Sequence, residues 1–385
     1  MSELIRFSMA DEPANLRALR QEVRGFIKDQ MACGVMVPSP YGWAEPNAAF
    51  SRALGQKKWI GMTWPSVYGG HERSAIERFV VTEELLAAGA PIRAHWVADR
   101  QSGPLLLKFG TEAQKQAFLP RIARGECFFC IGMSEPDSGS DLASIRTKAE
   151  KVEGGWKVTG TKIWTSNAHR VDMMILFVRT GPRGESRREG VSQFLVDLTL
   201  PGITIRPIIN LAGEHDFNEV IFEEAFIPDD MVIGTIGNGW KQVTNELVYE
   251  RSGPDRWTST FHVLDAMRSL VRRHPSATRQ AEVARLTARL WTLHQMSTSV
   301  AGMLENGEVP NTEAALVKDL GTTFEQDIPE VARKIFPEEL RETDEDFAQF
   351  NEALRYCTLY APGYTLRGGT KEILRGIIAK SLGLK

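Results

Sequence analysis

The chain has 385 residues, of which 42% are hydrophobic and 25% charged, a composition typical of a globular protein with two or three domains. Its 46 Lys and Arg residues nearly balance its 49 Asp and Glu residues, so the formal net charge is -3. Because no strong positive field results, neither nucleic acid nor an anionic membrane is expected as a partner.

The cysteine content and the first residues favour a cytoplasmic protein. Four cysteines are too few for a secreted disulfide scaffold of this size. The start, MSELIRFSMADE, lacks the basic-then-apolar pattern of a signal peptide. Cys127 and Cys130 have redox spacing, but their neighbours are apolar and no second such pair follows. Buried structural thiols, no disulfide and no metal are therefore expected.

Helical periodicity dominates the first third of the chain. Apolar residues recur at helical spacing over Asn15–Gln30, Ile76–Leu86 and Ala113–Ile122. The segment WPSVYGG contains the Pro and paired Gly that indicate a turn. Residues 1–125 are therefore predicted to form an N-terminal α-helical domain.

Beyond Glu126 the pattern changes to short β-branched or aromatic runs separated by Gly, Pro and Asp, which predicts a β-sandwich or β-barrel domain over residues 126–236. Helical spacing returns at Val243–Arg251, Val263–Val271, Glu282–Val300 and Thr312–Phe324. Residues 237–385 are therefore predicted to form a C-terminal four-helix bundle. The expected fold class is α+β, in the order helices, β-domain, helices.

Two motifs at the start of the β-region carry a family resemblance. The loop SEPDSGSD and the following strand GGWKVTGTKIWTSNA closely resemble the flavin-binding core of acyl-CoA dehydrogenases, and weaker similarity extends from WPSVYGG to the C-terminus. The resemblance implies an acyl-CoA dehydrogenase-like fold, FAD as cofactor and acyl-CoA as substrate. In that family FAD lies between the β-domain and a helical bundle. No G-x-G-x-x-G opens a βαβ unit here, so a Rossmann crevice is not expected.

The residues of these motifs suit a flavin on physical grounds. Ser134, Gly139 and Ser140 lie in a loop where small residues let the backbone approach a ligand and hydroxyls can hydrogen-bond it. Trp164 can stack on an isoalloxazine ring. Ser166, two positions further along the strand, can direct a hydroxyl or amide toward flavin N5.

The resemblance adds further cofactor positions: Ile131 and Met133 near the flavin, and Thr370 and Glu372 at the C-terminus. Thr370 is also a good N-cap for the helix that follows, whose free N–H groups favour an anionic phosphate. Ser140 matches a position that meets the phosphates of substrate or cofactor, so it is expected to bind both.

The catalytic base expected from the resemblance is missing from its usual place. The family reaction needs a carboxylate that removes the α-proton of an acyl thioester while the β-hydride goes to flavin N5. Most members carry it directly before Gly-Thr in the C-terminal loop, where this chain has Gly368. Gly368 retains a backbone N–H, which in the family hydrogen-bonds the thioester carbonyl.

Glu250 matches the position of the base in a minority of the family, including enzymes for branched, long or steroid-derived acyl-CoAs. Trp240, Val243, Leu247 and Glu250 are spaced by three, four and three residues, so the carboxylate extends an apolar helical stripe. Burial raises the pKa of a lone carboxylate, which suits a base. The alternative is a structural salt bridge to an arginine. Arg251 matches an arginine that contacts substrate or orients the loop in relatives.

Motifs that grip a neighbour's FAD in symmetric tetramers, Arg-x-x-Phe-Gly and Gln-x-x-Gly-Gly-x-Gly, are absent from the sequence. Similar losses occur in heteromeric acyl-CoA dehydrogenases that act on steroid side chains or diacids. The expected assembly is therefore a homodimer or tetramer, or a hetero-oligomer with a second homologous chain. An electron-transfer flavoprotein is the expected acceptor.

Two other functions remain open at this point: a catalytically silent or partner-dependent subunit, and a flavin-dependent oxidase or monooxygenase. Arg367, beside the reaction loop, is expected to serve the protein's own electrostatics, with a contact to the distal carboxylate of a diacid substrate as the alternative.

Overall fold

The computed structural model describes residues 5–8, 14–39, 45–343 and 345–384, and the side chains of 245–250, 339, 342, 343 and 346 lie outside that description. The chain forms two compact units, each assembled from segments distant in sequence. Unit 1 comprises Met1–Trp43, Ser74–Ala90 and Glu250–Lys385, and unit 2 comprises Ala44–Arg73 and Pro91–Tyr249.

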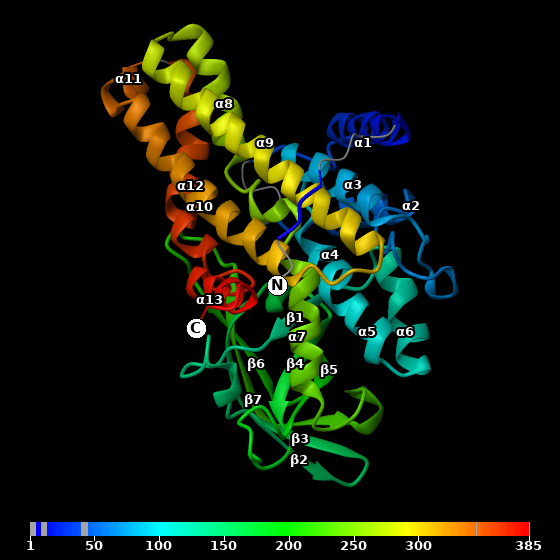
Figure 1. Ribbon diagram of the computed structural model, residues 1–385. Coiled ribbons are helices and arrows are strands. Elements are labelled where there is room, and N and C mark those ends of the chain that lie inside the picture. Colours follow the sequence, from blue (N-terminus) through cyan, green and yellow to red (C-terminus); the bar gives the residue numbers. More distant parts are fainter. Residues whose placement is uncertain (1–4, 9–13, 40–44, 344, 385) are drawn as a thin grey trace. The chain divides into compact units, whose positions relative to one another are not determined.

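Unit 2 is built on one mixed sheet (Figure 1), with the strand order β6-β7-β3-β2-β4-β5-β8 and with β1 beside β4. Its strands are β1 (Phe129–Gly132), β2 (Lys148–Val152), β3 (Gly155–Ser166), β4 (Met173–Arg179), β5 (Val191–Asp197), β6 (Ile203–Ile208), β7 (Phe217–Pro228) and β8 (Val232–Ile233). β4 and β5 are almost wholly buried. β4 is a continuous apolar run, whereas β5 also buries Ser192 and Gln193, and the edge strand β6 is largely exposed.

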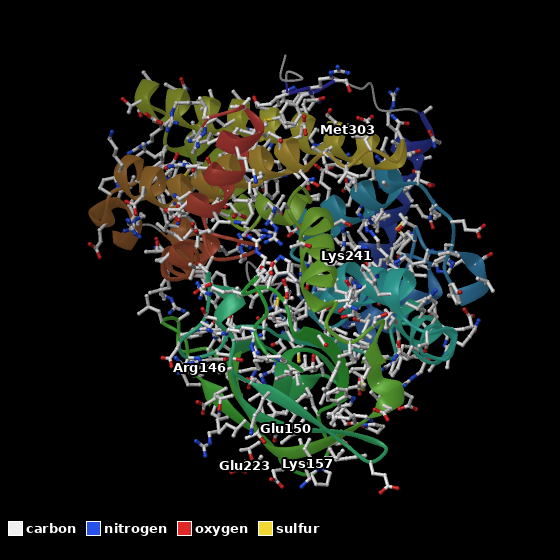
Figure 2. All side chains as sticks on the ribbon, turned by 60° about the horizontal axis from the view of Figure 1, so that its bottom comes forward. Arg146, Glu150, Lys157, Glu223, Lys241 and Met303 are labelled. Carbon is white, nitrogen blue, oxygen red and sulfur yellow. The ribbon has the colours of Figure 1, made fainter. Side chains whose placement is uncertain are left out.

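Strands β2 and β3 of this sheet carry exposed charged residues. Figure 2 shows Glu150 and Lys157, which pair in register across β2 and β3. Lys151, the neighbour of Glu150, forms an exposed ion pair with Asp229 at 2.6 Å. These side chains lie in water and therefore contribute little to stability.

The helices of unit 2 are α2 (Ala48–Gln56), α4 (Arg93–Val97), α5 (Gly103–Phe109), α6 (Glu112–Ala123) and α7 (Gly239–Glu250), with a π-helical turn at Ala98–Ser102. α6 begins with a capping box between Thr111 and Gln114, which satisfies the free N–H groups of its first turn. The buried Gln114 amide also donates to the carbonyls of Asp230 and Val232, at 2.6 and 2.8 Å. It thereby attaches α6 to the end of the sheet.

Unit 1 is helical and contains α1 (Ala14–Ala32), α3 (Ala75–Ala87), α8 (Phe261–Arg273), α9 (Ala277–Glu305), α10 (Asn311–Ile335), α11 (Glu338–Thr343), α12 (Ala348–Tyr364) and α13 (Lys371–Ser381). α8, α9, α10 and α12 lie side by side (Figure 1) and share one core that includes Leu286, Val300, Phe324 and Phe350. Arg20 on α1 pairs with Glu83 and Glu84 on α3 at 2.6 and 2.8 Å. This pairing holds α1 against α3.

The expected order of helices, β-domain and helices is confirmed, and the β-domain is a single mixed sheet in its hydrogen bonding. Three bundle helices, α8, α9 and α10, are longer than predicted. α10 continues past Phe324 to Ile335 with Pro329 inside it, because packing against α9 and α12 outweighs the lost hydrogen bond. The boundaries at 125/126 and 236/237 stay a sequence-level prediction.

The four cysteines are all free. Cys127, Cys130 and Cys357 are buried, whereas Cys33 is exposed. Burial raises the pKa of Cys127 to about 11 and that of Cys357 to about 12, so neither forms a thiolate at neutral pH. Among the helices described, none has the length and low charge needed to cross a membrane.

Candidate active site

A buried ion pair supports the loop that follows β1. Lys162 Nζ lies 2.8 Å from Glu135 Oε1 and donates to the carbonyl of Met133 at 3.0 Å. Glu135 also accepts from the backbone N–H groups of Arg146 and Thr147, at 2.6 and 2.9 Å. Both charged side chains are buried, with 0% of Lys162 and 7% of Glu135 exposed. The pair therefore fixes the start and the end of the loop to β3.

The electrostatics of this pair follow from its burial and its donors. Burial alone would raise the pKa of Glu135, but Lys162 and the surrounding N–H groups outweigh it, and the net shift is downward. Burial lowers the pKa of Lys162 to about 8, against the opposing effect of Glu135. Glu135 is therefore ionised and paired at neutral pH.

The predicted cofactor residues of this loop lie at or near its surface. Ile131 is partly buried in β1, and Ser134 is tied to β3 because its carbonyl accepts from the backbone N–H of Ile163 at 2.9 Å. Gly139 and Ser140 are exposed. At Gly139 no heavy atom lies within 4 Å of the place a Cβ would take. The loop therefore leaves room for a ligand at these two residues.

A small cavity is lined by both ends of the loop, including Glu135, Arg146 and Thr147. Its volume is about 180 Å³. Figure 2 shows the position of Arg146. Because small-molecule sites are typically about 300–1,000 Å³, this cavity suits ordered water rather than a cofactor.

Trp164 has an unusual backbone and an exposed ring. Its φ is +59°, a conformation that costs a bulky L-residue roughly 1–2 kcal/mol, and 57% of the residue is exposed. A β-bulge between Lys162 and Thr165 produces this conformation and interrupts the simple alternation of the strand. The ring contacts Phe217 edge-on at 5.9 Å, while Ser166 is partly buried. A strained, exposed tryptophan suits ring stacking with a ligand.

Helix α7 carries the stripe that leads to Glu250. Val243 is buried against Phe177 and Val191, and Trp240 and Met133 pack on the same cluster. The predicted apolar stripe is thus observed in its first two turns. The side chains of Leu247 and Glu250 lie outside the described residues, but the helix backbone continues through Glu250.

In unit 1 the C-terminal loop is held by glycines, an arginine and a helix cap. Gly368 and Gly369 have φ values of +66° and +101°, which favour glycine. Arg251, largely buried, donates from Nε to the carbonyl of Gly368 at 3.2 Å. Thr370 caps α13 by accepting from the N–H of Ile373. The residue that follows Glu250 is therefore bonded to the loop that lacks the usual carboxylate.

Glu372 lies exposed in the first turn of α13. Its own backbone N–H and the Thr370 hydroxyl lower the pKa of its carboxyl group. The start of α13 thus presents free N–H groups together with an ionised side chain.

Arg367 serves the electrostatics of the protein. Its guanidinium lies 2.5 Å from Glu325 Oε2, donates to Ser259 Oγ at 2.9 Å and stacks on the Tyr364 ring. Glu325 is fully buried and also accepts from the backbone N–H of Ser259 at 2.8 Å. The arginine therefore balances a buried carboxylate beside the loop.

Each unit, considered by itself, has features that suit part of a flavin nucleotide. Unit 2 provides the exposed Trp164 ring and an open loop at Gly139 and Ser140. Unit 1 provides the N-terminus of α13, a helix of 11 residues whose first N–H groups favour phosphate. Trp164 thus suits an aromatic ring and the start of α13 suits an anion, each considered by itself.

Comparisons with known proteins agree with this chemistry. The chain matches three family models: acyl-CoA dehydrogenase N-terminal domain over residues 13–126, middle domain over 130–225 and C-terminal domain over 237–383. It therefore belongs to the acyl-CoA dehydrogenase family, flavin-dependent oxidoreductases that act on the CH–CH group of an acyl-CoA.

Among curated relatives, acyl-CoA dehydrogenase IpdE1 of Mycobacterium tuberculosis is 31% identical, with 96% of this chain and 98% of that protein covered. Acyl-CoA dehydrogenase FadE34 of the same organism is also 31% identical over 98% of this chain, which spans only 50% of that longer protein.

Two solved structures share the whole fold at 27% identity. The Tcur3481-Tcur3483 steroid ACAD has a TM-score of 0.85, with 97% of this chain and 99% of the solved chain covered. The ChsE4-ChsE5 complex from Mycobacterium tuberculosis has a TM-score of 0.83, with 98% and 100% covered. The resemblance to subunits of heteromeric, steroid-type members is thereby confirmed.

Sequence reasoning missed the supporting residues. Glu135 lies inside the recognised motif, and Lys162 lies in the part of β3 that leads to Trp164. The charge of Glu135 and that of Lys162 were the available signals for this pair, because a buried charge needs a partner of opposite sign.

Proposed function

We propose that the chain catalyses FAD-dependent α,β-dehydrogenation of an acyl-CoA thioester to the trans-2-enoyl-CoA, with Glu250 as the base. One observation carries the proposal: Arg251, the residue after Glu250, is hydrogen-bonded to the carbonyl of Gly368. Most relatives carry their base at the position of Gly368. The chain thus has a carboxylate next to a residue that touches the loop from which the usual carboxylate is missing.

The residues then have distinct roles. The Glu250 carboxylate accepts the α-proton of the thioester. The backbone N–H of Gly368 donates to the thioester carbonyl and stabilises the negative charge that develops there, while Arg251 holds the same residue through its carbonyl. Bound FAD supplies the acceptor for the β-hydride. The cofactor would be held by Ile131, Met133, Ser134, Gly139, Ser140, Trp164, Ser166, Thr370 and Glu372, with Ser140 and Arg251 also serving the substrate.

The position of Glu250 on α7 supports its use as a base. The helix buries Val243 in the cluster on which Met133 also packs. Glu250 follows Val243 by seven residues, or two helical turns, so it extends the same stripe. A raised pKa for this carboxyl group is a prediction from the sequence pattern, because burial on an apolar stripe disfavours the anion.

The test is Glu250→Gln in the flavin-loaded protein. Flavin reduction by acyl-CoA should fall on the order of a thousandfold, because an amide cannot accept the α-proton. Anaerobic bleaching with branched, long-chain and steroid-derived acyl-CoAs measures it. Glu150→Gln, an exposed residue of β2, is the matched control. Near-wild-type reduction in Glu250→Gln, with flavin content unchanged, excludes Glu250 as the base.

A partner-dependent subunit is the second candidate, supported by two observations. The sequence lacks both motifs that grip a neighbour's FAD. One of its structural relatives is the ChsE4-ChsE5 complex. On this proposal the isolated chain holds FAD weakly and a second homologous chain completes the site. Size-exclusion chromatography with detection at flavin wavelengths distinguishes the two, since a homo-oligomer with one tightly held FAD per subunit excludes an obligatory partner.

The electron acceptor is proposed to be an electron-transfer flavoprotein. Oxygen consumption during turnover separates this proposal from the oxidase or monooxygenase alternative, because only the latter reduces oxygen directly at a high rate.

A further inference from the structure

Two histidines and one asparagine form a compact polar cluster at the end of β3. The rings of His169 and His215 are stacked, with centroids 3.7 Å apart and planes within 10°. Asn218 Oδ1 lies 3.1 Å from His169 Nδ1 and 2.8 Å from His215 Nε2. Asn218 is completely buried in β7. One amide oxygen thus meets two imidazoles.

The orientation of this amide follows from its third contact. Asn218 Nδ2 lies 2.9 Å from the carbonyl oxygen of Thr165. Because a carbonyl can only accept, the NH₂ group must face Thr165 and the oxygen must face the rings. Both imidazoles must then donate, which fixes the tautomer of each when neutral. All three polar contacts of the buried amide are therefore satisfied.

The carbonyl that Asn218 holds belongs to the strained part of β3. Thr165 lies between Trp164, whose φ is +59°, and Ser166. In the β3–β7 ladder Thr165 is opposite Asn218 and Ser166 is opposite Phe217. The backbone N–H of Asn167 continues the attachment by donating to the carbonyl of Asp216 at 2.8 Å. The cluster thus joins β7 to the segment that carries two expected flavin contacts.

We propose that Asn218, oriented by the stacked imidazoles of His169 and His215, is a positioning residue that holds the Trp164–Ser166 segment in the conformation that meets the flavin. This proposal rests on the proposed function for the identity of the ligand. The amide acts through the Thr165 carbonyl, so a strained φ is maintained by a side chain from the neighbouring strand.

The charges around the cluster keep the stacked rings from both being protonated. Burial lowers the pKa of His169, and His215 and Arg170 lower it further, while the bond to Asn218 and the charge of Asp216 oppose them. Among the described residues, the second ring nitrogen of His169 is buried without a hydrogen-bond partner, so a proton there would be unsolvated. Two cationic rings 3.7 Å apart would also repel each other. The donors to Asn218 therefore come from a pair that carries at most one charge.

The test compares Asn218→Leu with Gln114→Leu. Both remove a buried amide that donates to backbone carbonyls in unit 2, but Gln114 bonds Asp230 and Val232 instead of Thr165. In the flavin-free protein, hydrogen exchange at the amides of Ser166 and Asn167 should accelerate about tenfold or more in Asn218→Leu alone. In the loaded protein its flavin dissociation constant should rise about tenfold and its visible absorption bands should shift. Gln114→Leu should leave all three unchanged.

His215→Phe keeps a ring on His169 and removes one donor, so it decides the matter if Asn218→Leu does not fold. It should give changes in the same direction but smaller. Equal effects of Asn218→Leu and Gln114→Leu, or unchanged exchange and absorption in His215→Phe, overturn the proposal. The exchange measurement needs neither flavin nor acyl-CoA, so its outcome is independent of whether the dehydrogenation proposal holds.

Discussion

Two buried glutamates, one in each unit, are balanced in different ways. Glu135 in unit 2 is paired with a lysine that is itself wholly buried and receives two further backbone N–H groups. Glu325 in unit 1 is paired with Arg367, which is 20% exposed, and receives one backbone N–H from Ser259. The first pair is sealed from water, whereas the second is open on its cationic side.

The difference matches what each region holds in place. The loop after β1 is fixed at both ends, because the Glu135 carboxylate bonds Arg146, Thr147 and Lys162. The C-terminal loop depends on glycine backbone conformations, one arginine contact and a helix cap. An arginine remains charged because of its intrinsically high pKa, and its guanidinium is weakly hydrated, whereas a buried lysine gives up the strong hydration of its ammonium group. The first region should therefore respond to mutation through stability, and the second through flavin reduction.

Lys162→Met should have the largest effect on stability, a loss of about 3–5 kcal/mol, because it leaves Glu135 buried without its cation. Arg367→Met should cost less, since water reaches that pair. Urea unfolding measures both. Lys151→Met, which removes an exposed pair with Asp229, is the control and should cost under about 1 kcal/mol. A Lys162→Met loss no greater than that of the control would mean that the buried pair does not support the loop.

Arg251→Met should lower flavin reduction by about tenfold to a hundredfold while changing stability less, because a charge-assisted hydrogen bond is worth about 1.5–3 kcal/mol. Single-turnover bleaching with an acyl-CoA measures the rate. Arg268→Met, which removes an exposed pair on α8, is the control. A wild-type rate of flavin reduction in Arg251→Met would show that the contact between Arg251 and the Gly368 loop does not contribute to catalysis.

Acid should destabilise the part of unit 2 that the Glu135–Lys162 pair supports. The pKa of Glu135 is lowered in the folded protein, so its stabilising contribution is complete above its ordinary value of 4.5 and is lost as the pH falls through the lower folded value. The urea midpoint of the wild type should therefore fall more steeply than that of Glu135→Gln below pH 4.5. Parallel pH profiles of the two proteins contradict this assignment.

Thr370→Ala should have the smallest effect, a loss of about 1 kcal/mol confined to α13, because it removes the N-cap bond to Ile373 and the contact of the hydroxyl with Glu372. Hydrogen exchange in the first turn of α13 measures it. Thr370→Ser keeps the hydroxyl and should behave as the wild type. An equal effect of the two substitutions would show that the methyl group, and not the cap, stabilises this turn.

Much of the architecture follows from local patterns. The apolar periodicity predicted α1 and α3, and the β-branched runs predicted the sheet, because these elements bury one continuous face. The apolar residues Trp240 and Val243 also predicted the buried face of α7. The helix α12, which contains Pro362 in its last turn, was not predicted.

The supporting chemistry of the site depends on contacts that no local pattern contains. Lys162 meets Glu135 across 27 positions, and Asn218 meets Thr165 across 53. The bulge at Trp164 likewise depends on the register between β3 and β7. The alternation of side chains in an unbroken strand predicted Trp164 and Ser166 on the same face. It could not predict the strained backbone at Trp164, which leaves Trp164 exposed while Ser166 is partly buried. Glu250 stays a prediction.

The exposure of the four thiols to a labelling reagent can report which unit of the protein has unfolded. Only Cys33, just beyond α1, meets solvent, whereas one buried thiol lies in the helical core and two lie in or beside the sheet. A thiol reagent should therefore modify one site per native chain and up to four once both units have opened. Mass spectrometry can then assign each added label to Cys357 or to the Cys127–Cys130 segment, which distinguishes the loss of unit 1 from the loss of unit 2.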